Sequence, residues 1–227
     1  LSCDCRMIMG TYINKGNNAF RDIINSEYVD KTSLIPLINA TLNSERRYSC
    51  VTRCRRFGKS MAAKMLCAYY DKSCDSRELF VGLKAEQDKT FETYLNKYSV
   101  LYLDVTSFTA RPEFRTNIVR VIQEKIISEL KDAFPDVKYE DKSDLMDTLA
   151  AIHHATGEKF FFIIDEWDAI CREFPGRQKM KGDPETVTPT IMDEYVMLLR
   201  RLFKTQDSDK VFAGAYLTGI LPIKKYN

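Results

Sequence analysis

A turn between an expected strand and an expected helix carries the residues best suited to bind phosphate. It ends in Gly58-Lys59-Ser60, after a strand expected over residues 47–52 and before a helix expected over residues 61–70. Phosphate binds to backbone N–H groups at a helix N-terminus, where the helix dipole also favours an anion. Gly58 lets the backbone approach the ligand, Lys59 can reach the β- and γ-phosphates, and the Ser60 hydroxyl can ligate Mg²⁺. The turn therefore predicts a nucleoside triphosphate site.

The turn departs from the P-loop consensus at one position. That consensus has a glycine where this chain has Arg53, and a Gly-Lys-Ser triplet alone often occurs by chance. An ordinary glycine turn between a strand and a helix is therefore the alternative, and the strand–loop–helix setting is what favours a phosphate site. The residues expected to contact the nucleotide are Arg55, Arg56, Phe57, Gly58, Lys59, Ser60 and Met61.

Two carboxylates follow a wholly apolar segment farther along the chain. Residues Phe160 to Ile164 read as a strand buried on both faces of a parallel sheet, and Asp165-Glu166 come directly after it. In this position Asp165 would hold Mg²⁺ through water, and Glu166 would polarise the attacking water. The alternative is a buried strand that ends in a solvated acidic turn. Together with the Gly-Lys-Ser turn, the pair indicates a nucleotide site that uses Mg²⁺.

Three more polar residues lie at or near the ends of expected strands. Thr218 could hold the γ-phosphate or the lytic water, or it could serve only as a hydrogen bonder at the strand end. Asp104 could join the outer shell of the metal or cap the following turn. Asp168 could bind metal-bound waters or begin a helix.

The fold class follows from four apolar strands that alternate with long helices. This order favours an α/β fold with a central parallel sheet, and such sheets bind ligands at the carboxyl ends of their strands. We expect residues 1–16 to form an irregular tail and residues 17–227 to form one domain. The strands are expected at 47–52, 99–105, 159–164 and 211–217, and the longer helices at 61–70, 113–134, 144–154 and 190–205.

Composition excludes several classes of protein. The chain has 227 residues, of which 44% are hydrophobic and 29% charged, which argues against long disorder. No unbroken apolar run approaches the roughly 18 residues of a membrane span, and no apolar N-terminal signal is visible. Seven scattered cysteines then fit free thiols in a reducing cytoplasm.

Charge is nearly balanced overall, with 34 basic and 32 acidic residues, but it is concentrated locally. Part of the local positive charge could neutralise a triphosphate, and the rest could contact a nucleic-acid backbone. A solvated basic rim is the alternative. The basic cluster consists of Arg46, Arg47, Arg53, Arg55, Arg56 and Lys59.

These motifs resemble those of the AAA-ATPase-like family of microbial ATPases. The family has an Arg-Arg-Phe-Gly-Lys-Ser/Thr P-loop and an Asp-Glu-Tyr-Asp Walker B motif, which here read as residues 55–60 and 165–168. It also lacks the first P-loop glycine. Cys54 replaces the usual proline and Trp167 the usual tyrosine, and both changes leave the phosphate and metal ligands intact. Further matching segments are Tyr28-Val29-Asp30-Lys31-Thr32, residues 78–83 and residues 217–223.

The resemblance, which covers about residues 10–227, implies a P-loop NTPase fold. That fold is a three-layer αβα sandwich of the additional-strand, AAA-like class, with strand order 5-1-4-3-2. The resemblance also implies binding of ATP and Mg²⁺, and it allows a nuclease-like domain to follow in longer relatives. Since the chain stops at Asn227, we expect it to be truncated before the fifth strand and any helical lid.

The leading functional hypothesis is a Mg²⁺-dependent ATPase that couples its nucleotide state to a partner or effector domain, with an oligomer possible. GTP is disfavoured because the chain has no Asn/Thr-Lys-x-Asp guanine motif. A small-molecule kinase is weaker because Glu166 fits water activation better than acceptor binding. The non-enzymatic alternative is a nucleotide-binding switch or a DNA-associated scaffold.

Overall fold

The computed structural model describes residues 10–140, 144–174 and 189–221. Its central sheet has four strands, all parallel, in the order β1-β4-β3-β2. This order equals the 1-4-3-2 part of the expected topology, and the expected α/β class is confirmed. The strands are β1 (Tyr48–Thr52), β2 (Ser99–Asp104), β3 (Phe160–Asp165) and β4 (Phe212–Gly219).

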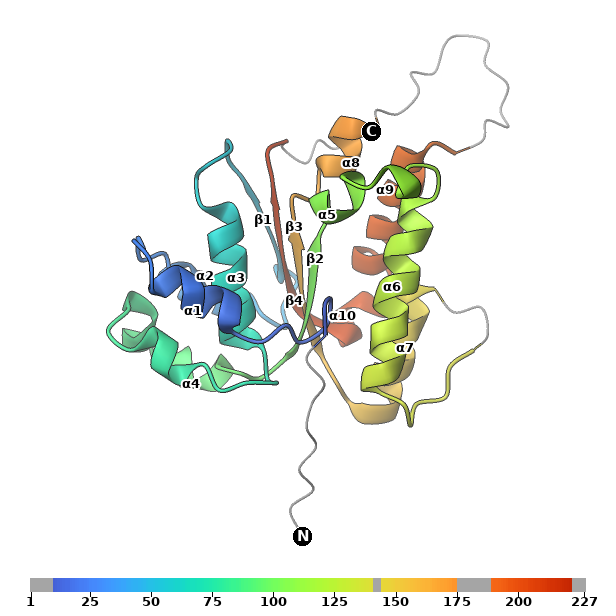
Figure 1. The fold of residues 1–227 in the computed structure, drawn as a ribbon. Helices are drawn as coiled ribbons and strands as arrows, with labels where there is room; N and C mark the ends of the chain where they lie inside the picture. The colour runs from blue at the N-terminus through green and yellow to red at the C-terminus, as the bar shows by residue number, and fades with distance from the viewer. Residues whose placement is uncertain (1–9, 141–143, 175–188, 222–227) are drawn as a thin grey trace.

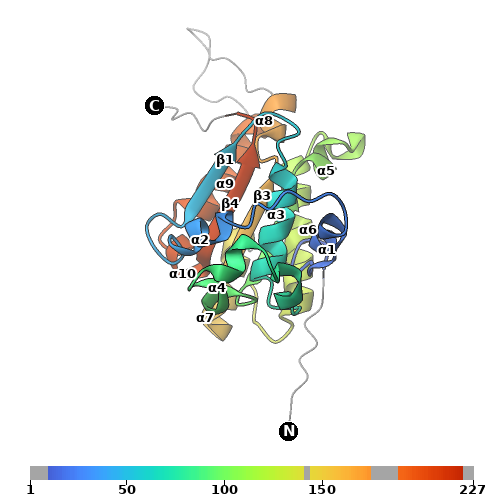
Figure 2. The ribbon, with the colours of Figure 1, turned by 90° about the vertical axis from the view of Figure 1, so that its left-hand side faces the viewer.

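Helices cover both faces of the sheet and make a three-layer sandwich (Figure 1). One face carries α1 (Asn18–Ile24), α2 (Leu34–Asn39), α3 (Lys59–Tyr70), α4 (Phe91–Tyr94) and the 3-10 turns η1 (Arg77–Phe80) and η2 (Lys84–Gln87). The other face carries α6 (Ile118–Ala133), α7 (Leu145–Thr156) and α9 (Ile191–Phe203). The remaining short pieces are α5 (Thr106–Thr109), η3 (Pro112–Phe114), α8 (Ala169–Glu173) and α10 (Ser208–Val211). Figure 2 shows the first layer after a quarter turn.

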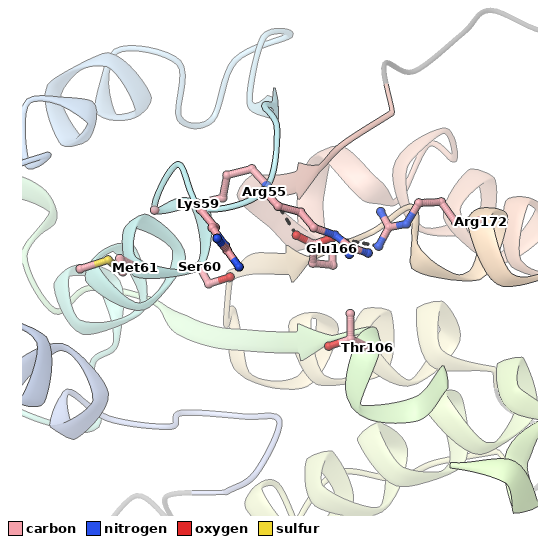
Figure 3. Close-up of a pocket in the computed structure, with 9 residues that line it drawn as sticks. Arg55, Lys59, Ser60, Met61, Thr106, Glu166 and Arg172 are labelled. Carbon is pink, nitrogen blue, oxygen red and sulfur yellow. Dashed lines mark hydrogen bonds and ion pairs between the residues drawn. The ribbon is translucent and has the colours of Figure 1, made fainter. Parts of the chain in front are cut away.

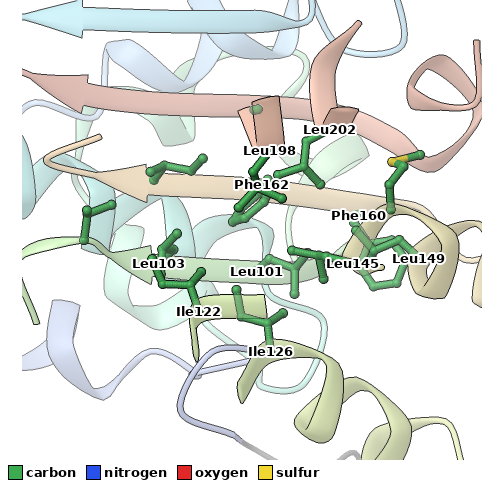
Figure 4. Close-up of a cluster of buried hydrophobic side chains, with 14 of the residues drawn as sticks. Leu101, Leu103, Ile122, Ile126, Leu145, Leu149, Phe160, Phe162, Leu198 and Leu202 are labelled. Carbon is green, nitrogen blue, oxygen red and sulfur yellow. The ribbon is translucent and has the colours of Figure 1, made fainter. Parts of the chain in front are cut away.

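Successive side chains along each strand point to opposite faces of the sheet, so the core consists of two clusters. On β3, Phe160, Phe162 and Ile164 pack toward α6, α7 and α9, whereas Phe161 and Ile163 pack toward α3. Every residue of β3 and β4 is buried, which explains the unbroken apolar sequence of β3. Figure 4 shows the first cluster, in which residues of β2 and β3 meet leucines and isoleucines of the three long helices.

Two helix boundaries have clear local causes. Helix α7 begins with a capping box between Asp144 and Asp147 and ends at Gly157, whose φ of 73° suits glycine. We predicted one helix over residues 113–134, but the observed helix α6 is shorter. It starts at Ile118, because η3 and a turn occupy the residues before Asn117. The hydrophobic period of that segment correctly predicted the part that packs on the sheet.

Residues 10–16 lie along the outer edge of β2. Ile13 forms an antiparallel bridge with Leu101 and is buried, and the amides of residues 11–13 donate to the carboxylate of Glu129 on α6. This part of the expected tail is irregular in structure yet packed on the domain. None of the helices among the described residues combines the length and apolar character needed to cross a bilayer.

Candidate functional site

The strand register brings the chemically interesting residues to one edge of the sheet. Asp104 of β2 pairs with Asp165 of β3, and Thr52 of β1 pairs with Gly219 of β4. Thr218 of β4 lies beside Asp165, to which its hydroxyl donates a hydrogen bond. The carboxyl ends of all four strands therefore meet where the loop of residues 53–58, the basic loop, leaves β1.

The basic loop presents free backbone donors to this edge. Arg56 and Gly58 both have a positive φ, at 68° and 70°, and α3 follows without a side-chain cap or an acidic residue in its first turn. Within the described part of the chain, no hydrogen-bond acceptor is recorded for the N–H groups of residues 55–61. The positive end of α3 and this row of N–H groups form a site that suits an anion.

Lys31, in the segment Tyr28–Thr32, fixes one peptide plane of the basic loop. Its ammonium group donates to the carbonyl oxygen of Phe57 at 2.6 Å. Because the peptide is planar and trans, the N–H of Gly58 points in the direction opposite to the Phe57 carbonyl, and so away from Lys31. A Cβ on Gly58 would displace the Lys31 ammonium from its place, and the positive φ of residue 58 is the feature that favours glycine here.

The Tyr28–Thr32 segment is itself firmly attached to its surroundings. The Tyr28 hydroxyl accepts from the Lys31 N–H at 3.2 Å and donates to the sulfur of Met65 on α3. Asp30 accepts from the Lys84 N–H at 3.0 Å. These contacts hold the backbone of Lys31 against α3 and η2, so its ammonium group reaches the basic loop from a fixed base.

Glu166 lies between two cations at the mouth of the site (Figure 3). Its Oε1 is 3.5 Å from Lys59 Nζ, and its Oε2 accepts from Arg172 Nη2 at 2.9 Å. Lys59 also donates to the carbonyl oxygens of Arg53 and Cys54, both at 3.1 Å. The Lys59 ammonium thus connects the carbonyl oxygens of the basic loop to the carboxylate of the candidate general base.

Thr218 holds the end of β3 in place. Its buried hydroxyl donates to Asp165 Oδ1 and accepts from the Glu166 N–H at 3.1 Å. Glu166 has a φ of 54°, a left-handed conformation that costs a non-glycine residue about 1–3 kcal/mol and often occurs at functional sites. Thr218 therefore positions the Asp165 carboxylate and the backbone of Glu166 in this structure. A direct contact of Thr218 with a phosphate or the lytic water stays a prediction.

Asp165 is buried beneath the cleft, with Tyr102 as its second partner. The Tyr102 hydroxyl donates to Asp165 Oδ2 at 3.3 Å. Burial raises the pKa of Tyr102 well above its usual value, and the nearby Asp165 charge adds to the shift, so Tyr102 stays a neutral donor. Asp165 is thus oriented from two sides by neutral hydroxyls.

The structure corrects one expectation for Asp168. This carboxylate is fully buried, with Oδ1 bonded to Arg172 and Oδ2 accepting from the N–H groups of Ile220 and Leu221 at 3.0 and 2.7 Å. Both oxygens are thus engaged within the protein rather than directed at a metal site. Asp168 stands at the N-cap position of α8, so the alternative that it begins a helix holds, although its side chain makes no capping bond. Asp104 accepts from the amide and hydroxyl of Thr106 at 3.0 and 2.6 Å, as expected of a turn cap.

A cleft of about 450 Å³ opens between the basic loop and the carboxylates, a size typical of small-molecule sites. Four cationic side chains and one carboxylate, Glu166, line it. The lining residues are Arg55, Arg56, Gly58, Lys59, Ser60, Met61, Thr106, Glu166 and Arg172.

The donor atoms near the cleft suit Mg²⁺. Ser60 and Asp165 offer a hydroxyl and a carboxylate, the hard oxygen donors that Mg²⁺ takes in small number together with waters and phosphate oxygens. The described residues contain no group of three or more His, Cys, Asp or Glu side chains that could hold a metal by themselves. The donor set thus fits a Mg²⁺ ion that arrives with phosphate.

A family model described as a predicted AAA-ATPase matches residues 15–227, which is nearly the whole chain. The chain belongs to this family. No curated protein and no solved structure matches it.

Most of the expected nucleotide contacts of this predicted AAA-ATPase lie together. Of the seven residues expected in and beside the basic loop, six line the cleft. Phe57 is the exception, because its side chain is 63% exposed and its carbonyl is turned to Lys31. Asp165 and Thr218 lie below the cleft, behind Glu166.

The basic cluster of the predicted AAA-ATPase is not one surface. Arg46 precedes β1 and Arg53 follows it, so the five-residue strand separates them by roughly 17 Å. Arg47 is buried, donating to the carbonyl oxygens of Ser44, Asp209 and Phe212 and pairing with the Asp209 carboxylate. The six residues of the basic cluster therefore do not form one patch, and contact of the exposed arginines with a nucleic-acid backbone stays a prediction.

Lys31, Thr106 and Arg172 are site residues that sequence reasoning missed. The segment that contains Lys31 matches the family's motif, but that match implies no role for the lysine. Thr106 follows the expected strand end at Asp104 by two residues, which is the one local signal for it. Arg172 is seven residues beyond Asp165 in the sequence. Its side chain reaches the cleft because the short helix α8 brings the chain back toward the cleft after β3.

Proposed function

We propose that this predicted AAA-ATPase binds ATP with Mg²⁺ in the cleft and hydrolyses it to ADP and phosphate. The observation that carries the proposal is the meeting of two features. The free N–H groups and Lys59 at the start of α3 face the carboxylates at the end of β3, with the cleft between them. Phosphate donors and a candidate base for water are the two parts that nucleotide hydrolysis requires.

Each part of the site has a proposed role. The amides of residues 55–60 and the Lys59 ammonium bind the phosphates, and Met61 lines the cleft beside them. Ser60 directly, and Asp165 through water, hold the Mg²⁺, which when bound neutralises phosphate charge. Glu166 accepts a proton from water while the water oxygen bonds to the γ-phosphorus. The bond from that phosphorus to the bridging oxygen of ADP breaks, and the proton later passes to solvent.

Coupling of the nucleotide state to other parts of the protein can use Asp168. This buried carboxylate joins Arg172 at the cleft to the amides of Ile220 and Leu221, just after β4. If Arg172 moved, Asp168 would lose its ion-pair partner. The hydrogen bonds that Asp168 accepts from the amides of Ile220 and Leu221 would then change in strength. We propose this connection as the route to a partner or effector domain.

A nucleotide-binding switch with negligible turnover is the second candidate. One observation favours it: each oxygen of Glu166 is paired with a cation, which leaves fewer acceptor sites for an attacking water. We also propose that the protein lies in the cytoplasm, and this proposal rests on its cysteines. The five cysteines among the described residues are all free thiols, which supports a reducing, cytoplasmic setting.

Two solution measurements test the proposal. Calorimetric titration with Mg²⁺–ATP should show saturable binding near one site per chain, and a phosphate-release assay should show steady turnover. Binding without turnover would leave only the switch, and absence of binding would contradict both candidates.

Lys31→Met should weaken ATP binding about tenfold, since a hydrogen bond from a charged group contributes about 1.5–3 kcal/mol and this one is exposed, which places it at the lower end of that range. The reason is that the Phe57 carbonyl would no longer be held, and the Gly58 N–H would lose its fixed direction. Calorimetry measures the affinity, and circular dichroism should be unchanged.

Two variants make the Lys31 test specific. Lys31→Arg should restore most of the affinity, because it still donates to the carbonyl. Lys84→Met removes an exposed ammonium from the neighbouring turn η2 and should have no effect. Wild-type affinity in Lys31→Met would show that the basic loop does not depend on this contact.

A further inference from the structure

Both oxygens of the candidate base are neutralised by cations in this structure. Lys59 Nζ is 3.5 Å from one oxygen of Glu166, and Arg172 Nη2 is 2.9 Å from the other. A general base must accept a hydrogen bond from the attacking water, and these two pairs leave fewer acceptor sites on Glu166 for that water. Nucleotide binding that displaces one of the cations would therefore free the carboxylate for this role. Lys59 already has a proposed phosphate partner, whereas Arg172 has none.

The side chain of Arg172 faces the cleft and is held there by a buried carboxylate. Its guanidinium group lines the cleft opposite the basic loop, and its side chain is 21% exposed (Figure 3). The second carboxylate that it contacts, Asp168, is fully buried and bonded to two backbone amides. Asp168 therefore fixes one side of the guanidinium and leaves the other side directed at Glu166 and the cleft.

The chemistry of the side chain allows an exchange of partners. A guanidinium group has five N–H donors in a planar fork, and among the described residues Arg172 donates two hydrogen bonds to carboxylates. The same fork binds phosphate oxygens in two-pronged contacts. Arg172 can thus keep Asp168 and replace Glu166 by a phosphate.

We propose that Arg172 binds the terminal phosphate of ATP in place of Glu166 and thereby releases the Glu166 carboxylate to accept a proton from water. This assignment rests on the proposed function of the cleft. It makes Arg172 a catalytic residue supplied by the same chain. ADP lacks the phosphate that competes for Arg172, so the Glu166–Arg172 pair stays closed with ADP and opens with ATP.

The experiment compares ATP with ADP in an Arg172→Ala variant. Calorimetry with a non-hydrolysable ATP analogue and with ADP gives both affinities, and phosphate release gives kcat and KM. ADP affinity should stay within about threefold of wild type, while affinity for the analogue falls about tenfold to a hundredfold, as expected for a lost charge-assisted contact. The kcat should fall on the order of a thousandfold, as for other arginines that stabilise phosphoryl transfer.

Two further variants separate this role from a purely structural one. Arg201→Ala removes an arginine that also pairs with two carboxylates, Asp144 and Asp147, outside the cleft, and it should leave both affinities and turnover unchanged. Arg172→Lys keeps the charge but not the fork, so it should restore part of the preference for the ATP analogue. If Arg172→Ala fails to fold, Arg172→Lys and the wild-type ratio of the two affinities carry the test.

The outcomes distinguish the assignment from the proposed function. Equal losses for ADP and the analogue, an unchanged ratio in the folded variants, or a wild-type protein that does not prefer the analogue would overturn the role of Arg172 alone. A wild-type protein that binds neither nucleotide would overturn the proposed function, and the assignment would fall with it.

Discussion

Glu166→Gln is expected to bind ATP at least as tightly as the wild type and to hydrolyse it at least about a hundredfold more slowly, the usual cost of losing a general base. Binding is preserved because the amide keeps the size of the carboxylate. It also no longer competes with phosphate for Lys59 and Arg172, which both pair with Glu166 in the free protein. Calorimetry and single-turnover phosphate release measure the two effects separately.

The chain offers a matched control for this variant. Glu158 pairs with Lys72 and is about as buried as Glu166, with side-chain exposures of 14% and 18%. It lies just before β3 begins, at the opposite end of the sheet from the cleft. Glu158→Gln should therefore leave both binding and turnover unchanged. Full turnover in Glu166→Gln would show that another group activates the water.

Lys59→Ala is expected to lower ATP affinity at least about a hundredfold, which corresponds to about 2.7 kcal/mol. The phosphates would lose their nearest buried cation, and Glu166 would be left facing them with Arg172 as its one remaining cation. The circular dichroism should not change, because the side chain of Lys59 contacts two loop carbonyls and the Glu166 carboxylate and packs in neither core cluster. Titration calorimetry measures the loss.

Lys72→Ala is the control for this second variant. It removes a lysine from an ion pair of the same kind, with Glu158, and should not alter ATP affinity. Unchanged affinity in Lys59→Ala with a folded protein would mean that the nucleotide binds elsewhere or through other groups.

The sequence predicted the sheet and its functional edge well, for a physical reason. Phe160 to Ile164 is apolar at every position because β3 is buried on both faces, and such a segment has few other structures available. Once the strands are parallel, the residues after them must meet at one edge. Lys59, Asp165 and Glu166 therefore came together as expected from local patterns alone.

Other features depend on contacts between distant segments, which the sequence does not display. Arg172 faces the cleft because Asp168, itself tied to the chain after β4, holds the guanidinium there. Lys31 reaches a loop 26 residues farther along the chain. Arg46 and Arg53 are near in sequence but lie at opposite ends of β1, so closeness in the sequence did not place them close together in the fold.

The central claim is that the start of α3 binds the phosphates of ATP. The most direct test is the electron density of crystals grown with Mg²⁺ and a non-hydrolysable ATP analogue. The account predicts a triphosphate in contact with the amides of residues 55–60 and with Lys59, with the terminal phosphate next to Arg172 and Mg²⁺ beside Ser60. An ordered nucleotide at another place, or an empty cleft at a concentration that saturates the protein in solution, would contradict it.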